Sequence, residues 1–345
     1  MATPDITIRG AGIFGLSIAW TCLQRGAHVQ VIDPNGPAAG ASGGIVGALA
    51  PHVPENWNPK KQFQLESLLM AEGFWAGVAG AGGGDPGYVR SGRIQPIADA
   101  HALDLAHSRS TSAQALWQDN ATWHIRPTGT GPWDLITPTG HEIFDTLSAH
   151  IHPRRACEAL VAALASKGVT VQADAPERGA VIHATGTAGL EALNTTHTRM
   201  VGVGIKGQAA LLDFALPGAP QLFVDTLHII PHADGTTAIG STTEREYDSP
   251  TDTDAALDAV INRARAAVPQ LRDAPVLARW AGLRPRSRSR APMLGAYPDR
   301  PGHYIANGGF KIGFGMAPKV AQTIADLVLE DRNTIPPGFD VAASL

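Results

Sequence analysis

The apolar positions of the first 33 residues form three short runs with two different periods. Residues 6–8 and 29–32 are brief runs with β-branched side chains, whereas residues 13–25 repeat apolar side chains at helical spacing. Glycines precede the helical run, and Gly26 follows it as a stop signal. The pattern predicts a strand, a helix and a second strand, which together form a βαβ unit.

Helical and strand-like periods continue to alternate after this unit, with one long interruption. Helices are predicted at residues 62–78, 154–167, 254–268 and 317–329. Strands are predicted at residues 169–171, 180–184, 201–212, 221–231, 236–241 and 303–306. The interruption, residues 79–146, is rich in Gly, Pro and Trp, and we expect it to be irregular apart from a strand-like stretch at 88–97.

These elements predict an α/β (α+β) fold with two domains. A second cycle of helix and strands in residues 154–184 indicates that the first domain resumes after an insertion. We therefore expect a discontinuous Rossmann-like domain, built from residues 1–84, 147–200 and 291–345. An inserted domain with an antiparallel sheet is expected from residues 85–146 and 201–290. A chain of 345 residues, 44% of them hydrophobic, is long enough for two such cores.

The charge and the cysteine count narrow the possible partners. Lys and Arg number 27 against 31 Asp and Glu, so no global positive field attracts polyanions. Cys22 and Cys157 lie far apart, which predicts neither a disulfide framework nor a metal cluster and fits a reducing, cytoplasmic compartment. The apolar stretch 13–23 follows a glycine turn rather than a basic segment, so it does not have the pattern of a signal peptide. No stretch approaches the roughly 20 apolar residues of a membrane span.

The glycine turn after the first predicted strand has the spacing of a dinucleotide-binding loop. Gly10 permits a tight turn, Gly12 lets the backbone approach a pyrophosphate, and Gly15 allows the helix to pack on the strand. Asp33 ends the second strand, where a carboxylate accepts hydrogen bonds from a ribose diol. No arginine directly follows Asp33 to hold a 2′-phosphate, which argues against NADP.

Six motifs in a fixed order turn this general signature into a family resemblance. They are Gly10 to Gly15, Asp33, Gly40 to Ser42 leading to Gly47 to Pro51, Ala184 to Gly186, Trp280 to Pro285, and Gly308 to Gly313 leading to Pro318. In this order the chain resembles the D-amino-acid-oxidase-like flavoproteins, and within them most of all glycine oxidase. The resemblance spans nearly the whole chain and implies FAD as the cofactor of the Rossmann-like domain.

The resemblance also implies which residues hold FAD. They are Gly10, Gly12, Ile13, Phe14, Gly15, Asp33, Ala41, Ser42, Gly47, Ala48, Leu49, Gly186, Gly309, Phe310, Lys311, Ile312 and Gly313. Ser42 is expected to donate a hydrogen bond to phosphate or ribose, and the helix after the C-terminal turn is expected to point its positive end at the flavin. Sarcosine oxidases attach the flavin through a cysteine near these C-terminal motifs. None lies there, so we expect noncovalent FAD.

The resemblance places the substrate at the inserted domain, which we therefore expect to bind a small amino acid. Arg284 occupies the position of the arginine that holds the substrate carboxylate, and its planar fork suits that role. Lys311 stands where glycine oxidase has a second arginine, and His228 replaces a tyrosine. His52, after the flavin loop, is a further candidate for the pocket lining. These differences leave the identity of the substrate open.

The implied reaction is the oxidation of a carbon–nitrogen bond by hydride transfer from the substrate Cα to flavin N5. The cofactor supplies the chemistry, so no general base is assigned. Either dioxygen or a quinone is expected to reoxidise the flavin, and the sequence does not distinguish them. It does not give the oligomeric state either.

The arginines at every second position from Arg284 to Arg290 keep an alternative open. On a strand they would share one face, and we expect Arg286, Arg288 and Arg290 to form a solvated rim. The stretches 41–51 and 291–295 also resemble the flavin domain of an enzyme that cleaves carboxymethylaminomethyl-uridine in tRNA, where such arginines would meet phosphates. The net charge of −4 argues against binding to nucleic acid.

Overall fold

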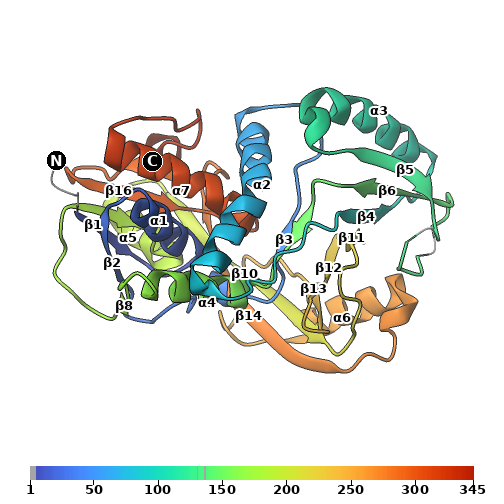
Figure 1. The fold of residues 1–345 in the computed structure, drawn as a ribbon. Helices are drawn as coiled ribbons and strands as arrows, with labels where there is room; N and C mark the ends of the chain where they lie inside the picture. The colour runs from blue at the N-terminus through green and yellow to red at the C-terminus, as the bar shows by residue number, and fades with distance from the viewer. Residues whose placement is uncertain (1–4, 130, 136) are drawn as a thin grey trace.

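Two β-sheets stand side by side in the computed structural model, which describes residues 5–129, 131–135 and 137–345. Figure 1 shows the six-stranded sheet with α1, α5 and α7 on one side of the molecule and the eight-stranded sheet with α3 and α6 on the other. Both described ends of the chain lie with the six-stranded sheet. None of the helices in the described residues combines the length and the apolar character that crossing a bilayer requires.

The six-stranded sheet carries the predicted βαβ unit at its centre. In spatial order its strands are β15 (Met293–Ala296), β16 (His303–Asn307), β9 (Ala180–His183), β1 (Asp5–Arg9), β2 (His28–Ile32) and β8 (Val171–Gln172). All neighbours run parallel except β15 and β16. Helix α1 (Ile13–Gln24) joins β1 to β2 and packs against α7 (Gly313–Glu330). The predicted strand-helix-strand start is therefore confirmed.

The eight-stranded sheet is antiparallel apart from one pair. Its order is β14 (Val276–Ser287), β10 (Gly202–Leu212), β13 (Thr237–Gly240), β12 (Leu227–Pro231), β11 (Gln221–Val224), β4 (Arg93–Pro96), β6 (His141–Asp145) and β5 (Trp123–Pro127). Only β11 and β4 run parallel among the described strands of this sheet. Helix α6 (Ala255–Ala267) covers one face through a core that includes Leu257 and Ile261.

The register of the eight-stranded sheet decides which side chains share its other face. Ala209 pairs with Gly240 on β13 and with Trp280 on β14, and Gly240 pairs in turn with His228 on β12. Directly paired residues point to the same side of a sheet. Ala209 and Trp280 both line the large cavity described below. This face therefore looks toward the cavity, while α6 packs on the opposite face.

The helices expected from the apolar pattern are present. They are α2 (Pro59–Val78), α4 (Pro153–Ala165), α6 and α7. Helix α7 begins at Gly313, four residues before the predicted start, so the predicted turn and the helix share Gly313. Helix α5 (Gly186–Thr196) was not predicted, because its start was interpreted only as a cofactor motif.

The prediction of an irregular region at residues 79–146 is right only for its strand-like stretch 88–97, which contains β4. The rest of the prediction is wrong, because the region also contains α3 (Ala100–Trp117), β5 and β6. Helix α3 buries only Ala106, Ala113 and Trp117 among its described residues, so its sequence lacks an apolar stripe. It starts at Asp99, whose side chain accepts a hydrogen bond from the backbone of Ala102.

Two strand predictions also need correction. The run 221–231 is not one strand but the hairpin β11–β12, whose turn residues Asp225 and Thr226 both have positive φ values of 47° and 63°. Strand β14 ends at Ser287, so Arg288 and Arg290 do not continue its alternation. The predicted α/β (α+β) fold class is confirmed. All strands of each sheet fall within the residue ranges proposed for its domain, and the domain boundaries themselves stay a prediction.

Candidate active site

The glycine turn between β1 and α1 depends on the absence of side chains. Gly10 has a φ of 104°, and a Cβ there would lie 2.3 Å from the carbonyl oxygen of Ala184. A Cβ at Gly15 would lie 1.8 Å from the carbonyl oxygen of Gly10. The predicted roles of both glycines, a tight turn and close packing of helix on strand, therefore match the structure. Gly12 caps α1 without a side-chain hydrogen bond.

Asp33 and Ser42 hold the two sides of this turn. One carboxylate oxygen of Asp33 accepts a hydrogen bond from the Ala11 amide at 2.8 Å, and the other accepts one from Asn35 at 3.0 Å. The Ser42 hydroxyl accepts a hydrogen bond from the Ile13 amide at 2.9 Å, which leaves its own proton free to donate. Both side chains line the same cavity as Gly10 and Gly12.

This cavity measures about 730 Å³ and runs from the glycine turn to the eight-stranded sheet. Segments of both sheets form its wall. The lining includes residues 39–42, 44–48, 184–188, 280–285, 306–307, 309–311 and 313–314. Cavities that bind small molecules commonly measure about 300–1,000 Å³. The cavity thus has the size of a ligand site and is lined by segments of both sheets.

The donors of the cavity fit FAD. Helices α1 and α7 both begin at the cavity, and neither is capped by the side chain of its N-cap residue. Ser42 accepts the hydrogen bond of the Ile13 amide, and the other N–H groups of the two first turns are available to anionic or electron-rich atoms. Asp33 offers carboxylate oxygens at one end for a ribose diol. Residues 44–48 form part of the wall, and Ile151 N donates a hydrogen bond to Gly47 O there at 2.9 Å.

Most of the predicted cofactor residues line the cavity. They are Gly10, Gly12, Ile13, Phe14, Asp33, Ala41, Ser42, Gly47, Ala48, Gly186, Gly309, Phe310, Lys311 and Gly313. Gly15, Leu49 and Ile312 lie behind this wall: Gly15 packs the helix on the turn, and Leu49 is fully buried in β3 (Ala48–Leu49). These three residues support the cradle without lining it.

Arg284 is a buried guanidinium at the far end of the cavity. It lies on β14, is 9% exposed, and donates one hydrogen bond, to Thr242 O at 3.2 Å. It takes part in no ion pair within the described residues, although the nearby charge of Glu244 raises its pKa. Burial outweighs that effect and lowers the Arg284 pKa to about 10. A buried cation with unused N–H groups favours an anionic ligand.

Gly207 makes room for this guanidinium. A Cβ at Gly207 would lie 1.7 Å from Arg284 Nη1 and 2.1 Å from its Cζ. The Trp280 indole lies on the same strand, with its ring 5.9 Å from the Arg284 Cζ. The position of Arg284 thus depends on a glycine on the neighbouring strand β10 as well as on its own strand.

Lys311 lines the cavity near Arg284. Its Nζ lies 5.8 Å from the centre of the Phe310 ring, and Phe310 N donates to Pro285 O at 2.9 Å. Partial burial, with a smaller contribution from the charge of Arg284, lowers the Lys311 pKa. The C-terminal turn and β14 are therefore joined beside two cations that line the same cavity, and their role in binding a carboxylate stays a prediction.

His228 lies on the cavity-facing side of the sheet but does not line the cavity itself. Its ring packs on Phe223 at 4.8 Å between ring centres, and its buried Nδ1 has no hydrogen-bond partner among the described residues. Burial, assisted by the charges of Arg93 and Lys311, lowers the His228 pKa to about 3, so the ring is neutral near pH 7. Its predicted role in substrate binding stays a prediction.

His52 contacts helix α2 and does not line the cavity. Its backbone N–H donates to Gln64 Oε1 at 2.7 Å, and its Nδ1 contacts the same oxygen. Gln64 Nε2 donates in turn to Ala50 O at 3.2 Å. The residue does not line the cavity, so its contacts give it a structural task and leave its predicted substrate contact unsupported.

The other arginines of the run lie in different surroundings from Arg284. Arg286 lies over the Phe310 ring, with its Cζ 5.7 Å from the ring centre. Arg288 and Arg290 are exposed, and Arg290 adopts a φ of 61° in the turn after β14. The expected common strand face is therefore wrong beyond Ser287, because the chain turns there.

Sequence reasoning missed the residues that surround Arg284 from neighbouring strands. Gly207, Thr242 and Glu244 come from segments 40 or more positions before Arg284, and each touches it or influences its charge. The signal available in the sequence was Lys206-Gly-Gln208, a polar interruption of an otherwise apolar strand. Such an interruption indicates buried polar contacts but does not say with what.

A comparison with known families matches residues 5–327 to the model of "DAO: FAD dependent oxidoreductase". Among curated relatives, the bifunctional protein ThiO/ThiG of Trichormus variabilis is 26% identical over 354 residues, which cover 96% of this chain and 53% of that protein. The chain therefore spans about half the length of this relative. Glycine oxidase of Pseudomonas aeruginosa is 32% identical over 158 residues, covering 46% of this chain and 43% of that protein.

Solved structures agree on the fold. The crystal structure of glycine oxidase from Geobacillus kaustophilus superposes with a TM-score of 0.83 at 20% identity, covering 99% of both chains. Iminodiacetate oxidase from Chelativorans sp. BNC1 superposes with a TM-score of 0.83 at 23% identity, covering 96% of this chain and 97% of that chain. At these identities the likeness shows a common fold.

Proposed function

The chain belongs to the DAO family of FAD-dependent oxidoreductases, and we propose that it oxidises the carbon–nitrogen bond of a small amino acid or N-substituted amino acid. One observation carries the proposal. A single cavity leads from the glycine turn, which suits a dinucleotide, to the buried Arg284, whose N–H groups are mostly unused by the described residues. The relatives named as glycine oxidase and ThiO support the same class of reaction.

In this proposal Arg284 holds the substrate carboxylate by charge-assisted hydrogen bonds, and Lys311 adds a second positive charge beside it. Thr242 O fixes one side of the Arg284 fork, so the remaining N–H groups point the carboxylate in one direction. Orientation of this kind contributes a large share of the rate when a substrate must present one particular bond.

When bound, FAD would be held by the glycine turn, Asp33 and the C-terminal turn, and it would supply the acceptor for a hydride from the substrate Cα. Loss of this hydride together with one N–H proton converts the substrate amine into an imine. Water hydrolyses the imine to an oxo acid and to ammonia or a smaller amine. The ionisable side chains in the described lining are Arg9, Asp33, Arg284 and Lys311. Asp33 is engaged at the glycine turn, so no carboxylate or histidine of this lining stands at the Arg284 end as a general base.

Several finer features are part of the proposal. We infer noncovalent FAD, because Cys22 and Cys157 are both buried and neither lines the cavity. Burial raises the pKa of each thiol to about 12, so neither is a reactive thiolate. Free cysteines also fit the proposed cytoplasmic location. Dioxygen and a quinone both remain proposed electron acceptors, and mixing the reduced enzyme with each in turn separates them.

The tRNA-modifying alternative has no support in the structure or in the relatives. Arg284 is buried at the cavity and Arg286 stacks on Phe310, which leaves only Arg288 and Arg290 of the run exposed. Two exposed arginines in one turn do not form the extended basic surface that binding to a folded RNA requires.

Anaerobic mixing of the flavin-loaded protein with a panel of small amino acids and N-methyl amino acids tests the proposal. We expect at least one of them to bleach the flavin absorbance. If none reduces the flavin, the proposed activity is wrong, whatever the affinity for carboxylates.

Arg284→Ala should then weaken transition-state binding of the reactive substrate by about 2–5 kcal/mol, mainly through KM, because it removes a desolvated charge pair. Steady-state kinetics measure this change. Arg288→Ala is the matched control, because Arg288 belongs to the same run but is exposed, and its kinetics should stay within about twofold of the wild type. Equal losses in both variants would place the carboxylate elsewhere.

A further inference from the structure

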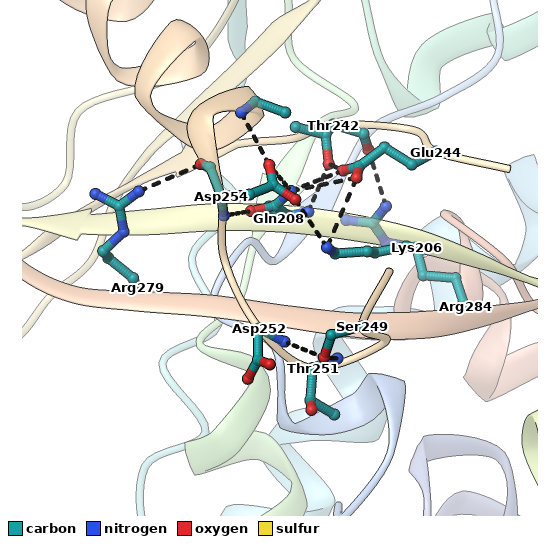
Figure 2. Close-up of polar contacts among 11 residues, drawn as sticks. Lys206, Gln208, Thr242, Glu244, Ser249, Thr251, Asp252, Asp254, Arg279 and Arg284 are labelled. Carbon is teal, nitrogen blue, oxygen red and sulfur yellow. Dashed lines mark hydrogen bonds and ion pairs between the residues drawn. The ribbon is translucent and has the colours of Figure 1, made fainter. Parts of the chain in front are cut away.

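Two buried polar side chains flank Gly207 on β10, on the face of the sheet that α6 covers. Lys206 and Gln208 are 1% and 0% exposed. Buried polar groups need partners, and a buried lysine needs a carboxylate. Both side chains find these partners in Glu244 and Asp254. We call Lys206, Gln208, Glu244 and Asp254 the polar cluster, and Figure 2 shows them converging beside β10.

The polar cluster closes the base of one loop, residues 245–253. Lys206 Nζ lies 3.0 Å from a carboxylate oxygen of Asp254 and 3.8 Å from one of Glu244. Gln208 Nε2 donates to Glu244 at 3.0 Å and to Asp254 at 2.8 Å. The same two side chains of β10 thus hold both ends of the loop. Short loops with adjoining ends are frequently functional.

One end of the loop reaches Arg284 through Thr242. Thr242 N donates to Gln208 O at 3.2 Å, and Thr242 Oγ1 accepts from Gln208 N at 2.8 Å and also contacts Glu244. These contacts fix the Thr242 carbonyl, which accepts the hydrogen bond from Arg284. Figure 2 shows Arg284 reaching Thr242 from β14, the strand next to β10.

The middle of the loop reaches the cavity. Pro250 and Thr251 line it together with Arg284, although both are exposed toward its mouth. The Ser249 hydroxyl accepts hydrogen bonds from Thr251 N at 3.4 Å and Asp252 N at 3.2 Å, which shapes the chain at this point. The loop therefore contributes to the wall of the cavity that Arg284 also lines.

We propose that Lys206, Gln208, Glu244 and Asp254 are positioning residues of the substrate site, which fix loop 245–253 so that Thr242 orients Arg284 and Pro250 and Thr251 bound the space beside the carboxylate. The inference rests on the proposed function only in that the anion at Arg284 is a substrate carboxylate. Hydrogen bonds from Gln208, Ala256 N and Lys206 lower the pKa of Asp254 to about 2, so this carboxylate is charged near neutral pH.

The proposal predicts three measurements on the flavin-loaded protein. Lys206→Met should weaken the binding of acetate, followed through the flavin absorbance spectrum, by about tenfold, which equals about 1.4 kcal/mol. It should also speed tryptic cleavage after Arg245, the exposed arginine of the loop, identified by mass spectrometry. The affinity for FAD should stay within about twofold, because the cluster does not line the cavity.

Lys319→Met is the matched control. It removes another lysine ion pair, 3.0 Å from Glu66, at a site away from the cluster, and should change none of the three measurements. Lys206→Arg keeps the charge and should restore acetate binding to within about threefold of the wild type. If Lys206→Met does not fold, Asp254→Asn serves instead, because Asn also caps α6 while the charge is lost.

Two outcomes would overturn the proposal. Faster cleavage after Arg245 with unchanged acetate binding would mean that the cluster holds the loop without positioning Arg284. Unchanged cleavage and unchanged acetate binding would mean that the cluster holds neither. Neither measurement requires turnover, so a failure here is distinguishable from a failure of the proposed oxidation, which the anaerobic panel alone decides.

Discussion

The two ends of the cavity are built in different ways. The glycine-turn end consists mainly of backbone groups, together with the Asp33 carboxylate. Gly10, Gly12 and Asp33 lie within 24 consecutive residues, and their contacts join β1, α1 and β2. The Arg284 end is built around one side chain, the guanidinium, which groups from β10, β14 and the segment around Thr242 surround. One end is local in sequence, and the other is assembled from distant segments.

This difference teaches where each end is vulnerable. A backbone cradle fails when any atom is added to it, because the close contacts there are with main-chain groups that cannot turn aside. A side-chain site fails when a supporting contact is removed or displaced, while the cofactor cradle stays intact. The following predictions separate these two kinds of failure.

Gly15→Ala should cause the largest effect, at the backbone end. The new Cβ would lie 1.8 Å from Gly10 O, so the turn must open, at a cost of about 3 kcal/mol. We expect a lower free energy of unfolding in denaturant and weaker FAD binding measured by fluorescence titration. Gly73→Ala in α2 is the control, because nothing lies within 4 Å of its Cβ, and it should be neutral or stabilising. Equal losses in both would contradict the packing argument.

Gly207→Ala should act on the side-chain end alone. Its Cβ would displace the Arg284 guanidinium, which is flexible enough to move, so the cost falls on ligand binding rather than on folding. We expect acetate to bind about tenfold more weakly, or about 1.4 kcal/mol, with the affinity for FAD unchanged. A titration of the flavin spectrum measures both. Loss of FAD binding together with acetate binding would show that the two ends are not separable.

The smallest effect concerns a group of buried histidines outside the cavity lining, in which the rings of His152 and His232 lie 4.5 Å apart and His150 pairs with β3. Burial, with a contribution from His232, lowers the pKa of His150 and of His152 from 6.5 to about 4. The unfolded chain therefore binds protons first as the pH falls, and stability is lost between about pH 6.5 and pH 4.

Between pH 7.5 and pH 5.5 each of these histidines should cost about 1 kcal/mol of the free energy of unfolding, measured by denaturant titration. His150→Gln should flatten this dependence. His28→Gln should not, because the His28 side chain is 75% exposed. A stability that rises on acidification in this range would contradict the assigned cause.

The difference between the ends also explains what the sequence could predict. The βαβ start was predictable because strand, turn and helix each leave a local period in the sequence, and the glycine spacing depends on the same local geometry. Helix α3 was missed because it is mostly exposed and has no apolar stripe to reveal it. The β11–β12 hairpin was missed because its turn, Asp225 and Thr226, contains no glycine although both residues adopt positive φ.

At the site, Arg284 was predictable from the motif Trp280 to Pro285, but its surroundings were not. Its contact with Thr242 and its space above Gly207 join positions 42 and 77 residues away, and strand register rather than local pattern sets such pairs. His52 looked like a pocket residue in sequence, yet its contacts with Gln64 bind it to α2. The position of a residue next to a motif in the sequence does not predict the direction in which its side chain points.

The space above Gly207 constrains how positions 207 and 284 can change during evolution. Any side chain at position 207 displaces the Arg284 guanidinium, so a substitution at one of the two positions changes the effect of a substitution at the other. A lineage that lost Arg284 could replace Gly207 on β10 by a larger residue, because the space of the guanidinium would be empty. To recover carboxylate binding at this point, both positions would then have to change back. The pair works as an evolutionary ratchet, in which preference for a carboxylate is easier to lose than to regain.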